Sequence, residues 1–143
     1  MQAIRSFLIV LFMAVASTAV AQQTISISEL VNTKWRVENI RISDYDEYTL
    51  TEIIWKRQDR SFFKYPYYLT DTPVTSHDKS AFDYSKVGKT KKGSYIVCIN
   101  EKMGIVYCSS IESFDKTKGV FVTKLVTQGL IGSGGIDRYK LVK

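Results

Sequence analysis

The sequence predicts an all-β protein, an antiparallel barrel or sandwich of about eight strands. Three observations support this class. Short runs with strand composition alternate with turn residues at regular spacing along the chain. Two tight turns, each ending in glycine, join three of these runs into a meander. Helical periodicity is confined to one brief segment near the N-terminus.

The meander over residues 94–127 is the best-defined part of the chain. A three-residue hairpin loop requires a left-handed residue at its last position, and glycine adopts that conformation without steric cost. Gly104 and Gly119 stand at this position in two similar turns. The first turn then pairs Glu101 with Ile105, and this register extends outward along both strands.

This register places the two cysteines of the chain, Cys98 and Cys108, opposite each other. Counting outward from the closing pair, they fall at a non-hydrogen-bonded site, where Cα atoms lie about 4.5 Å apart, within disulfide range. A disulfide is therefore predicted, and two free thiols are the alternative. The spacing does not match a catalytic Cys-x-x-Cys pair.

The two-residue period of a strand assigns one face of the meander to the interior. The residues on that face are Tyr95, Val97, Ile99, Ile105, Tyr107, Ile111, Phe121 and Leu125. The cysteines fall on the opposite face. Bulky side chains on one shared side indicate a buried interior.

Residues 1–21 have the pattern of a secretory signal peptide. Arg5 supplies a positive charge, residues 7–15 are apolar, and Ala19-Val20-Ala21 forms a small-x-small cleavage site. The apolar run is short for a bilayer span. We therefore expect a periplasmic or secreted protein without a stable membrane anchor after cleavage. The remaining residues, 22–143, are enough for one domain.

The other predicted elements can be placed by range. They are a helical turn over 28–32, strands over 34–42, 48–57, 61–69 and 136–142, and short strands at 74–77 and 81–87. A bulge is expected near Asn39, where the apolar phase slips, and an acidic turn is expected over 43–47. Pro66 lacks an N–H donor, which predicts an edge strand or an irregularity there.

A short helical turn, followed by a tryptophan that opens the first strand of a small exported meander, resembles the lipocalin-like (calycin) family. The likeness is closest to small secreted lipocalin-like proteins of Bacteroidetes type. That family opens with Gly-x-Trp, and here Thr33 takes the place of the glycine before Trp35. The family often packs an arginine of its last strand on this tryptophan, and Arg138 is the matching residue. The resemblance implies an up-and-down barrel with a short helical turn and a cavity open at one end.

The sequence contains no recognisable catalytic set, metal site or cofactor motif. Its single histidine, His77, lies in a polar stretch, and zinc sites require three or four ligands. Asp44, Asp46 and Glu52 lack the glycine and terminal glutamate of a calcium-binding hand, so a charged turn is expected. We expect no enzyme activity, no cofactor and no nucleic-acid partner, since no aromatic and basic platform is visible. The net charge is +6, and its clearest cluster is Lys86, Lys89, Lys91 and Lys92. A solvated loop is expected there, and a patch for an anionic ligand is the alternative.

Clustered aromatic residues form the candidate ligand site. Tyrosine offers flat apolar area and a hydroxyl group that can orient a ligand. The residues predicted to bind a ligand are Tyr65, Tyr67, Tyr95, Tyr107 and Phe121. Ordinary core packing is the alternative for each. The expected function is an exported, non-enzymatic barrel that holds a small apolar or amphipathic molecule. The competing hypothesis is a protein- or glycan-interaction module that uses exposed Trp55, Tyr68 and a strand edge around a filled interior. Nothing in the sequence indicates the oligomeric state.

Overall fold

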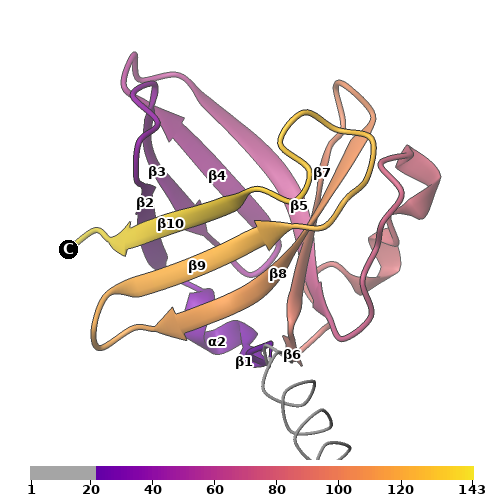
Figure 1. The fold of residues 1–143 in the computed structure, drawn as a ribbon, viewed down its shortest axis with the longest axis horizontal. Coiled ribbons are helices and arrows are strands. Elements are labelled where there is room, and N and C mark those ends of the chain that lie inside the picture. The colour runs from indigo at the N-terminus through magenta and orange to yellow at the C-terminus, as the bar shows by residue number, and fades with distance from the viewer. Residues whose placement is uncertain (1–21) are drawn as a thin grey trace, which may run out of the picture.

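Eight antiparallel strands close into a single barrel (Figure 1). The computed structural model describes residues 22–143, so the predicted signal peptide over residues 1–21 lies outside the described residues. Each barrel strand pairs with the next barrel strand along the chain, and the last strand pairs with the first. The predicted all-β, up-and-down barrel is confirmed. None of the helices within residues 22–143 has the length and apolar content needed to cross a bilayer.

The strands differ in length around the barrel. Its members are β2 (Thr33–Val37), β3 (Ser43–Tyr48), β4 (Glu52–Arg57), β5 (Phe62–Thr70), β7 (Tyr95–Asn100), β8 (Ile105–Asp115), β9 (Val120–Leu125) and β10 (Ile136–Leu141). Outside the barrel lie the paired strands β1 (Ile25–Ser26) and β6 (Lys92–Gly93), helix α2 (Ile27–Leu30), and the 3-10 turns η1 (Lys79–Ala81) and η2 (Tyr84–Lys86).

Helix α2 begins one residue before the predicted turn. Its N-cap is Ser26, whose backbone N–H donates to the Glu29 carboxylate at 2.8 Å in a capping box. The turn ends where Asn32 adopts a left-handed conformation with φ of 63°. Figure 1 shows that α2 lies across one end of the barrel. The short helix therefore closes that end.

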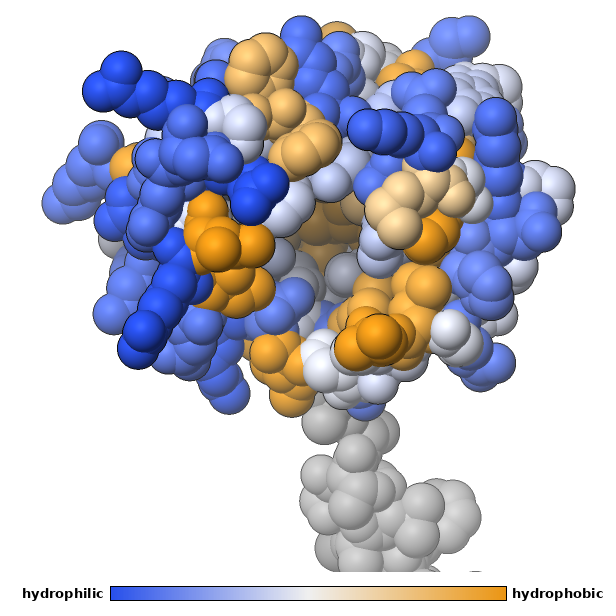
Figure 2. Space-filling view, turned by 90° about the horizontal axis from the view of Figure 1, so that it is seen from above, coloured by the Kyte–Doolittle hydropathy of each residue, from blue (hydrophilic) through white to orange (hydrophobic). Residues whose placement is uncertain are grey.

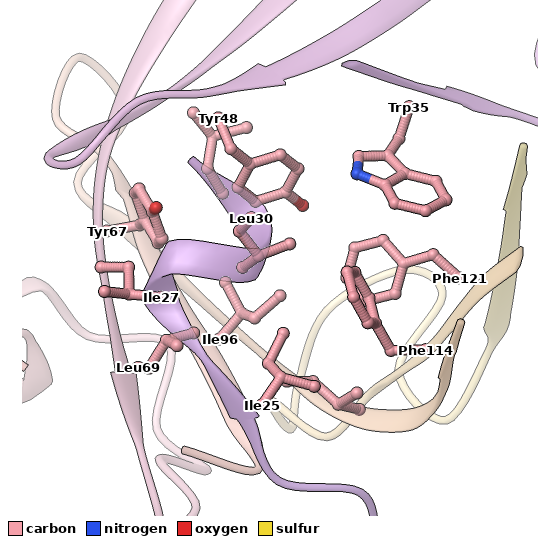
Figure 3. Close-up of a cluster of buried hydrophobic side chains, with 12 residues drawn as sticks. Ile25, Ile27, Leu30, Trp35, Tyr48, Tyr67, Leu69, Ile96, Phe114 and Phe121 are labelled. Atoms are coloured by element: carbon pink, nitrogen blue, oxygen red, sulfur yellow. The ribbon is translucent and has the colours of Figure 1, made fainter. Parts of the chain in front are cut away.

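An aromatic cluster above α2 forms the floor of the barrel (Figure 3). Trp35 is fully buried, and its ring centroid lies 5.4 Å from that of Phe114 and 5.3 Å from that of Phe121. The indole N–H donates to the hydroxyl of Thr33 at 2.8 Å, which satisfies its one polar group. Leu30 of α2 packs against the same cluster. The floor is thus filled with side chains and excludes water.

A second hydrophobic core lies outside the barrel wall. It comprises Tyr68, Phe82, Val97, Ile99, Val106 and Cys108. Residues 71–91 cover this outer face, and the ring centroid of Phe82 lies 5.0 Å from that of Tyr68. The short strands predicted over 74–77 and 81–87 are therefore wrong, because this segment folds as turns over a hydrophobic wall. Asp78 and Asp83 cap these turns by accepting backbone N–H bonds at 2.9 and 3.0 Å.

The hairpin register differs from the prediction by one residue. Gly104 and Gly119 do have positive φ, at 67° and 68°, so both turns end in a left-handed glycine as expected. However, the strands pair Asn100 with Ile105, which makes the first loop four residues long rather than three. A glycine at the last loop position fits both loop lengths. A shift of one residue moves every side chain of a strand to the other face.

The predicted disulfide is wrong for this reason. Cys98 pairs with Tyr107 and faces the barrel interior, whereas Cys108 pairs with Val97 and faces the outer core. Both cysteines are free thiols. The same shift places Val97 and Ile99 in the outer core instead of the barrel interior.

Two other local predictions also need correction. The acidic segment 43–47 is not a turn but most of strand β3, and the chain turns instead at Asn39, which has a φ of 69°. Pro66 does not mark an edge, because β5 pairs with β4 as far as Pro66 and with β7 only from Tyr67 onward. The missing N–H therefore falls beyond the end of the β7 ladder, where it costs no hydrogen bond.

Replacing Trp35 with alanine should lower the free energy of unfolding by about 3–5 kcal/mol, because it removes the largest side chain of the packed floor. Urea denaturation monitored by circular dichroism measures the change. A loss below about 1 kcal/mol would contradict the assignment of Trp35 to the packed floor.

Both thiols should be available in the unfolded chain. Denaturation in iodoacetamide without reductant should alkylate Cys98 and Cys108, as read by mass spectrometry. In the native protein Cys108 should react slowly with a thiol reagent, because it is fully buried. A protein that is alkylated only after reduction would instead contain the disulfide.

Candidate functional site

The barrel interior above the floor is hollow. A cavity of about 370 Å³ opens at the end of the barrel opposite α2, and Figure 2 looks into this hollow from above. Its aromatic lining consists of Tyr48, Trp55, Tyr65, Tyr107 and Tyr139, and its aliphatic lining of Val37, Ile40, Ile53, Ile96 and Leu125. Ser43, Asp46, Cys98, Ser109, Thr123 and Asp137 complete the wall. This volume is within the range of small-molecule sites. We call this cavity the lumen.

The strand period explains how polar residues reach the lumen. On β3, Asp46 and Tyr48 both face inward, because Asp46 pairs with Trp35 and Tyr48 pairs with Thr33 across the β2–β3 ladder. On β10, Asp137 and Tyr139 occupy inward positions in the same way. Each of these strands therefore contributes one carboxyl group and one phenol to the lumen.

Two of the five predicted ligand residues lie in the lumen wall, Tyr65 and Tyr107. Tyr67 and Phe121 are fully buried in the floor instead, where the Tyr67 hydroxyl donates to the Thr49 carbonyl at 2.6 Å. Tyr95 packs against the outer core, because the register of β7 turns it away from the interior.

The two lumen carboxyl groups lack partners. Within residues 22–143, neither Asp46 nor Asp137 makes a hydrogen bond or an ion pair through its side chain. Burial, together with the negative charge of Asp137, raises the pKa of Asp46 to about 7. Burial also raises the pKa of Asp137. One of the two carboxyl groups is thus partly protonated near neutral pH.

The other titratable lumen groups stay neutral in this range. Burial raises the pKa of the Cys98 thiol to about 12, and the charge of Asp46 adds to this effect. Burial likewise raises the pKa values of the phenols of Tyr48, Tyr65, Tyr107 and Tyr139. Asp46, with a pKa of about 7, is therefore the lumen group that changes charge around neutral pH.

The sequence reasoning missed Asp46, Asp137 and the inward position of Trp55. The two-residue period of a strand could have found the aspartates. Asp46 lies two residues from Tyr48, and Asp137 lies two residues from Tyr139, so each aspartate shares a strand face with a tyrosine. The acidic composition around Asp46 suggested a turn and concealed that pattern.

A stacked cluster stands beside the mouth of the lumen. The Trp55 ring lies 5.6 Å from the ring of Phe63, and its indole N–H donates to the Ser43 hydroxyl at 3.0 Å. The Arg57 guanidinium lies over both rings, at 5.6 Å from Trp55 and 5.9 Å from Phe63. The buried Nε of Arg57 has no hydrogen-bond partner among the described residues. These contacts hold Trp55 in place as part of the wall.

Exposed apolar side chains gather around the mouth. Of the large hydrophobic residues that are exposed, Ile40, Ile42, Phe62, Phe63, Met103, Ile131 and Ile136 lie on or beside the four connections at this end of the barrel. Figure 2 shows hydrophobic residues spaced around the opening. An apolar rim of this kind is typical of an opening that a ligand or a partner contacts. We call this set the rim.

A second hollow of about 810 Å³ lies where the β2–β3 connection meets the C-terminal residues. Three of its charged residues are paired with each other or with a neighbour, since Arg36 pairs with Asp44 at 3.1 Å and Lys140 pairs with Glu38 at 3.4 Å. The lumen is the better candidate, because it is the interior of the barrel and its half-buried Asp46 has a strongly raised pKa.

The predicted contact between Trp35 and Arg138 is wrong. Trp35 points into the floor, whereas Arg138 is exposed on the outer face of β10, with inward-facing Asp137 and Tyr139 on either side. Phe114 and Phe121 take the place of the arginine. His77 is exposed and its Nδ1 lies 3.0 Å from the Gln128 carbonyl oxygen. Residues 22–143 contain no group of three or more side chains placed to hold a metal ion.

Replacing Asp46 with asparagine should stabilise the protein at pH 8 and have little effect at pH 4. The folded pKa is raised, so the folded state binds more protons than the unfolded state between about pH 4 and pH 7, and stability falls as the pH rises through this window. A shift from 3.8 to about 7 corresponds to roughly 4 kcal/mol at most. Thermal or urea unfolding at the two pH values measures the difference, and equal effects at both would contradict the buried position.

Comparisons of the chain with protein-family models, with curated proteins and with solved structures found no match.

Proposed function

We propose that this chain is an exported, non-enzymatic binding protein that holds a small apolar or amphipathic molecule in its lumen. The observation that carries the proposal is the cavity of about 370 Å³ above a filled aromatic floor. Eight-stranded barrels either fill their interior with side chains or hold one small ligand. In this barrel the side chains fill only the lower part.

The composition of the lumen favours a ligand with both apolar and polar parts. Five aromatic and five aliphatic residues supply most of the wall, and a few polar side chains interrupt it. Small-molecule sites have this character, because apolar area supplies affinity and a few polar groups orient the ligand. The rim extends the apolar surface outward to the point where a ligand enters.

The interaction-module hypothesis has less support. It requires a free strand edge and a filled interior, whereas the barrel sheet closes on itself and encloses a cavity. The rim is the one feature that favours it, since contiguous exposed apolar residues also occur at protein interfaces. A ligand entrance accounts for the same residues.

A neutral fluorescent dye tests the proposal directly. N-phenyl-1-naphthylamine should bind the mature protein and gain fluorescence, because it leaves water for an apolar cavity. Binding should also lower the tryptophan emission by energy transfer to the dye, because Trp55 lines the lumen and Trp35 lies two strands away.

Variants that fill the lumen provide the control. Thr123→Trp and Leu125→Trp place bulk in the cavity and should abolish dye binding, whereas Lys124→Trp adds the same side chain to the exposed outer face and should not. Circular dichroism and thermal unfolding verify that each variant is folded. Dye binding that survives both lumen variants, or a wild-type protein that binds neither the dye nor octan-1-ol, would overturn the proposal.

A further inference from the structure

We infer that the lumen selects a cationic amphiphile, a molecule with a protonated amino group that pairs with Asp46 and Asp137 and an apolar part that contacts the wall. This inference rests on the proposed function, since it names the class of ligand for the same cavity. It is carried by two carboxyl groups that line the cavity, half-buried Asp46 and exposed Asp137, and that have no partner among the described residues.

The unpaired state of these groups is the central observation. Buried charges in proteins are normally paired or hydrogen-bonded, because an uncompensated charge in a medium of low dielectric constant is costly. Asp46 is half-buried in the lumen wall, and within the described residues its carboxylate accepts no hydrogen bond and forms no ion pair. Asp137 faces the same cavity from an exposed position on β10. A cationic ligand would supply the missing partner for both.

No side chain of the lumen can supply a positive charge in its place. The lining contains no lysine, arginine or histidine. The nearest stacked cation is Arg57, whose guanidinium lies over Trp55 and Phe63 at the mouth. The charge of Asp137 raises the pKa of Asp46, and no positive group lowers it. The charged side chains that line the cavity therefore contribute a negative electrostatic potential.

The walls also suit an ammonium group. Trp55, Tyr65 and Tyr107 line the lumen, and aromatic rings attract a cation through their negative faces. Aliphatic surface from Ile53 and Ile96 remains for the apolar part of the ligand. A carboxylate pair surrounded by aromatic and aliphatic surface thus matches an amine with a hydrocarbon tail.

This ligand class predicts a particular pH dependence. The titratable groups around Asp46 are Tyr48 on the same strand, Tyr65 on β5, Cys98 on β7, Tyr107 on β8, and Asp137 and Tyr139 on β10. All but the aspartates stay neutral below pH 8, and an alkylamine stays protonated. Affinity for the amine should therefore fall as Asp46 becomes protonated, by about tenfold per pH unit below its pKa of about 7.

The experiment compares three probes of equal chain length: octylammonium, octan-1-ol and octanoate. Isothermal titration calorimetry and displacement of N-phenyl-1-naphthylamine measure their affinities for the mature protein at pH 5, 6, 7 and 8. We expect octylammonium to bind at least about tenfold more tightly than octan-1-ol at pH 8, and octanoate to bind most weakly. The advantage of octylammonium should shrink at pH 5, because Asp46 is then protonated, while the affinity for octan-1-ol should stay constant.

Substitutions of Asp46 and Asp137 test whether these two carboxyl groups cause the preference for octylammonium. Asp46→Asn and Asp137→Asn should each weaken octylammonium binding by about tenfold or more and change octan-1-ol binding less than about twofold. Glu47→Gln is the matched control, because it removes the same charge from the next residue of β3 on the outer face and should change neither affinity. Retained octan-1-ol binding shows that each variant keeps an intact lumen.

The outcomes separate this inference from the proposed function. If octan-1-ol or octanoate binds as tightly as octylammonium at pH 8, the lumen binds ligands without selecting cations, and the inference is wrong while the proposed function stands. A Glu47→Gln effect equal to that of Asp46→Asn would assign the selectivity to overall charge and would also overturn it. If none of the three probes binds, this inference is overturned, and the proposed function is overturned with it only if N-phenyl-1-naphthylamine also fails to bind.

Discussion

Closure of the sheet is the constraint on which the rest of this structure depends. β10 pairs with β9 on one side and with β2 on the other, so every barrel strand has two neighbours. In a closed sheet each strand side chain points either inward or outward, and a change of register in one strand pair exchanges the two sets. One residue of register between β7 and β8 therefore decides that Cys98 faces the lumen and Cys108 faces the outer core.

The hydrophobic residues are divided between two cores, and this division leaves the lumen open. The floor contains Trp35, Phe114 and Phe121 stacked above α2, while Tyr68 and Phe82 belong to the outer core. The outer core packs against the outside of the wall, and the inner core fills the interior only at the end near α2. The upper interior is instead lined by residues that leave space between them, and Tyr48, Ile53 and Ile96 belong to both the inner core and this lining.

The sequence was sufficient for the class of the fold, because alternation and turn residues are local signals. It also placed Trp35 in the core, and Tyr65 and Tyr107 in the wall that now surrounds the lumen. It was insufficient for the register, because a glycine in the left-handed conformation ends both three- and four-residue loops. It also could not identify Asp46 as an interior residue. The local sequence around an aspartate is the same whether strands distant in the sequence cover it or leave it exposed.

The outer core gives the barrel two unlike walls. On one side, β5, β7 and β8 have hydrophobic packing on both faces, because η1, η2 and the chain around them cover the outside. On the other side, β2 carries the exposed residues Lys34 and Arg36 on its outer face. Densely packed layers resist deformation. If the opening widens to admit a molecule, the single-layered wall around β2 should move more than the double-layered wall formed by β5, β7 and β8. The entrance therefore has a more flexible side and a more rigid side.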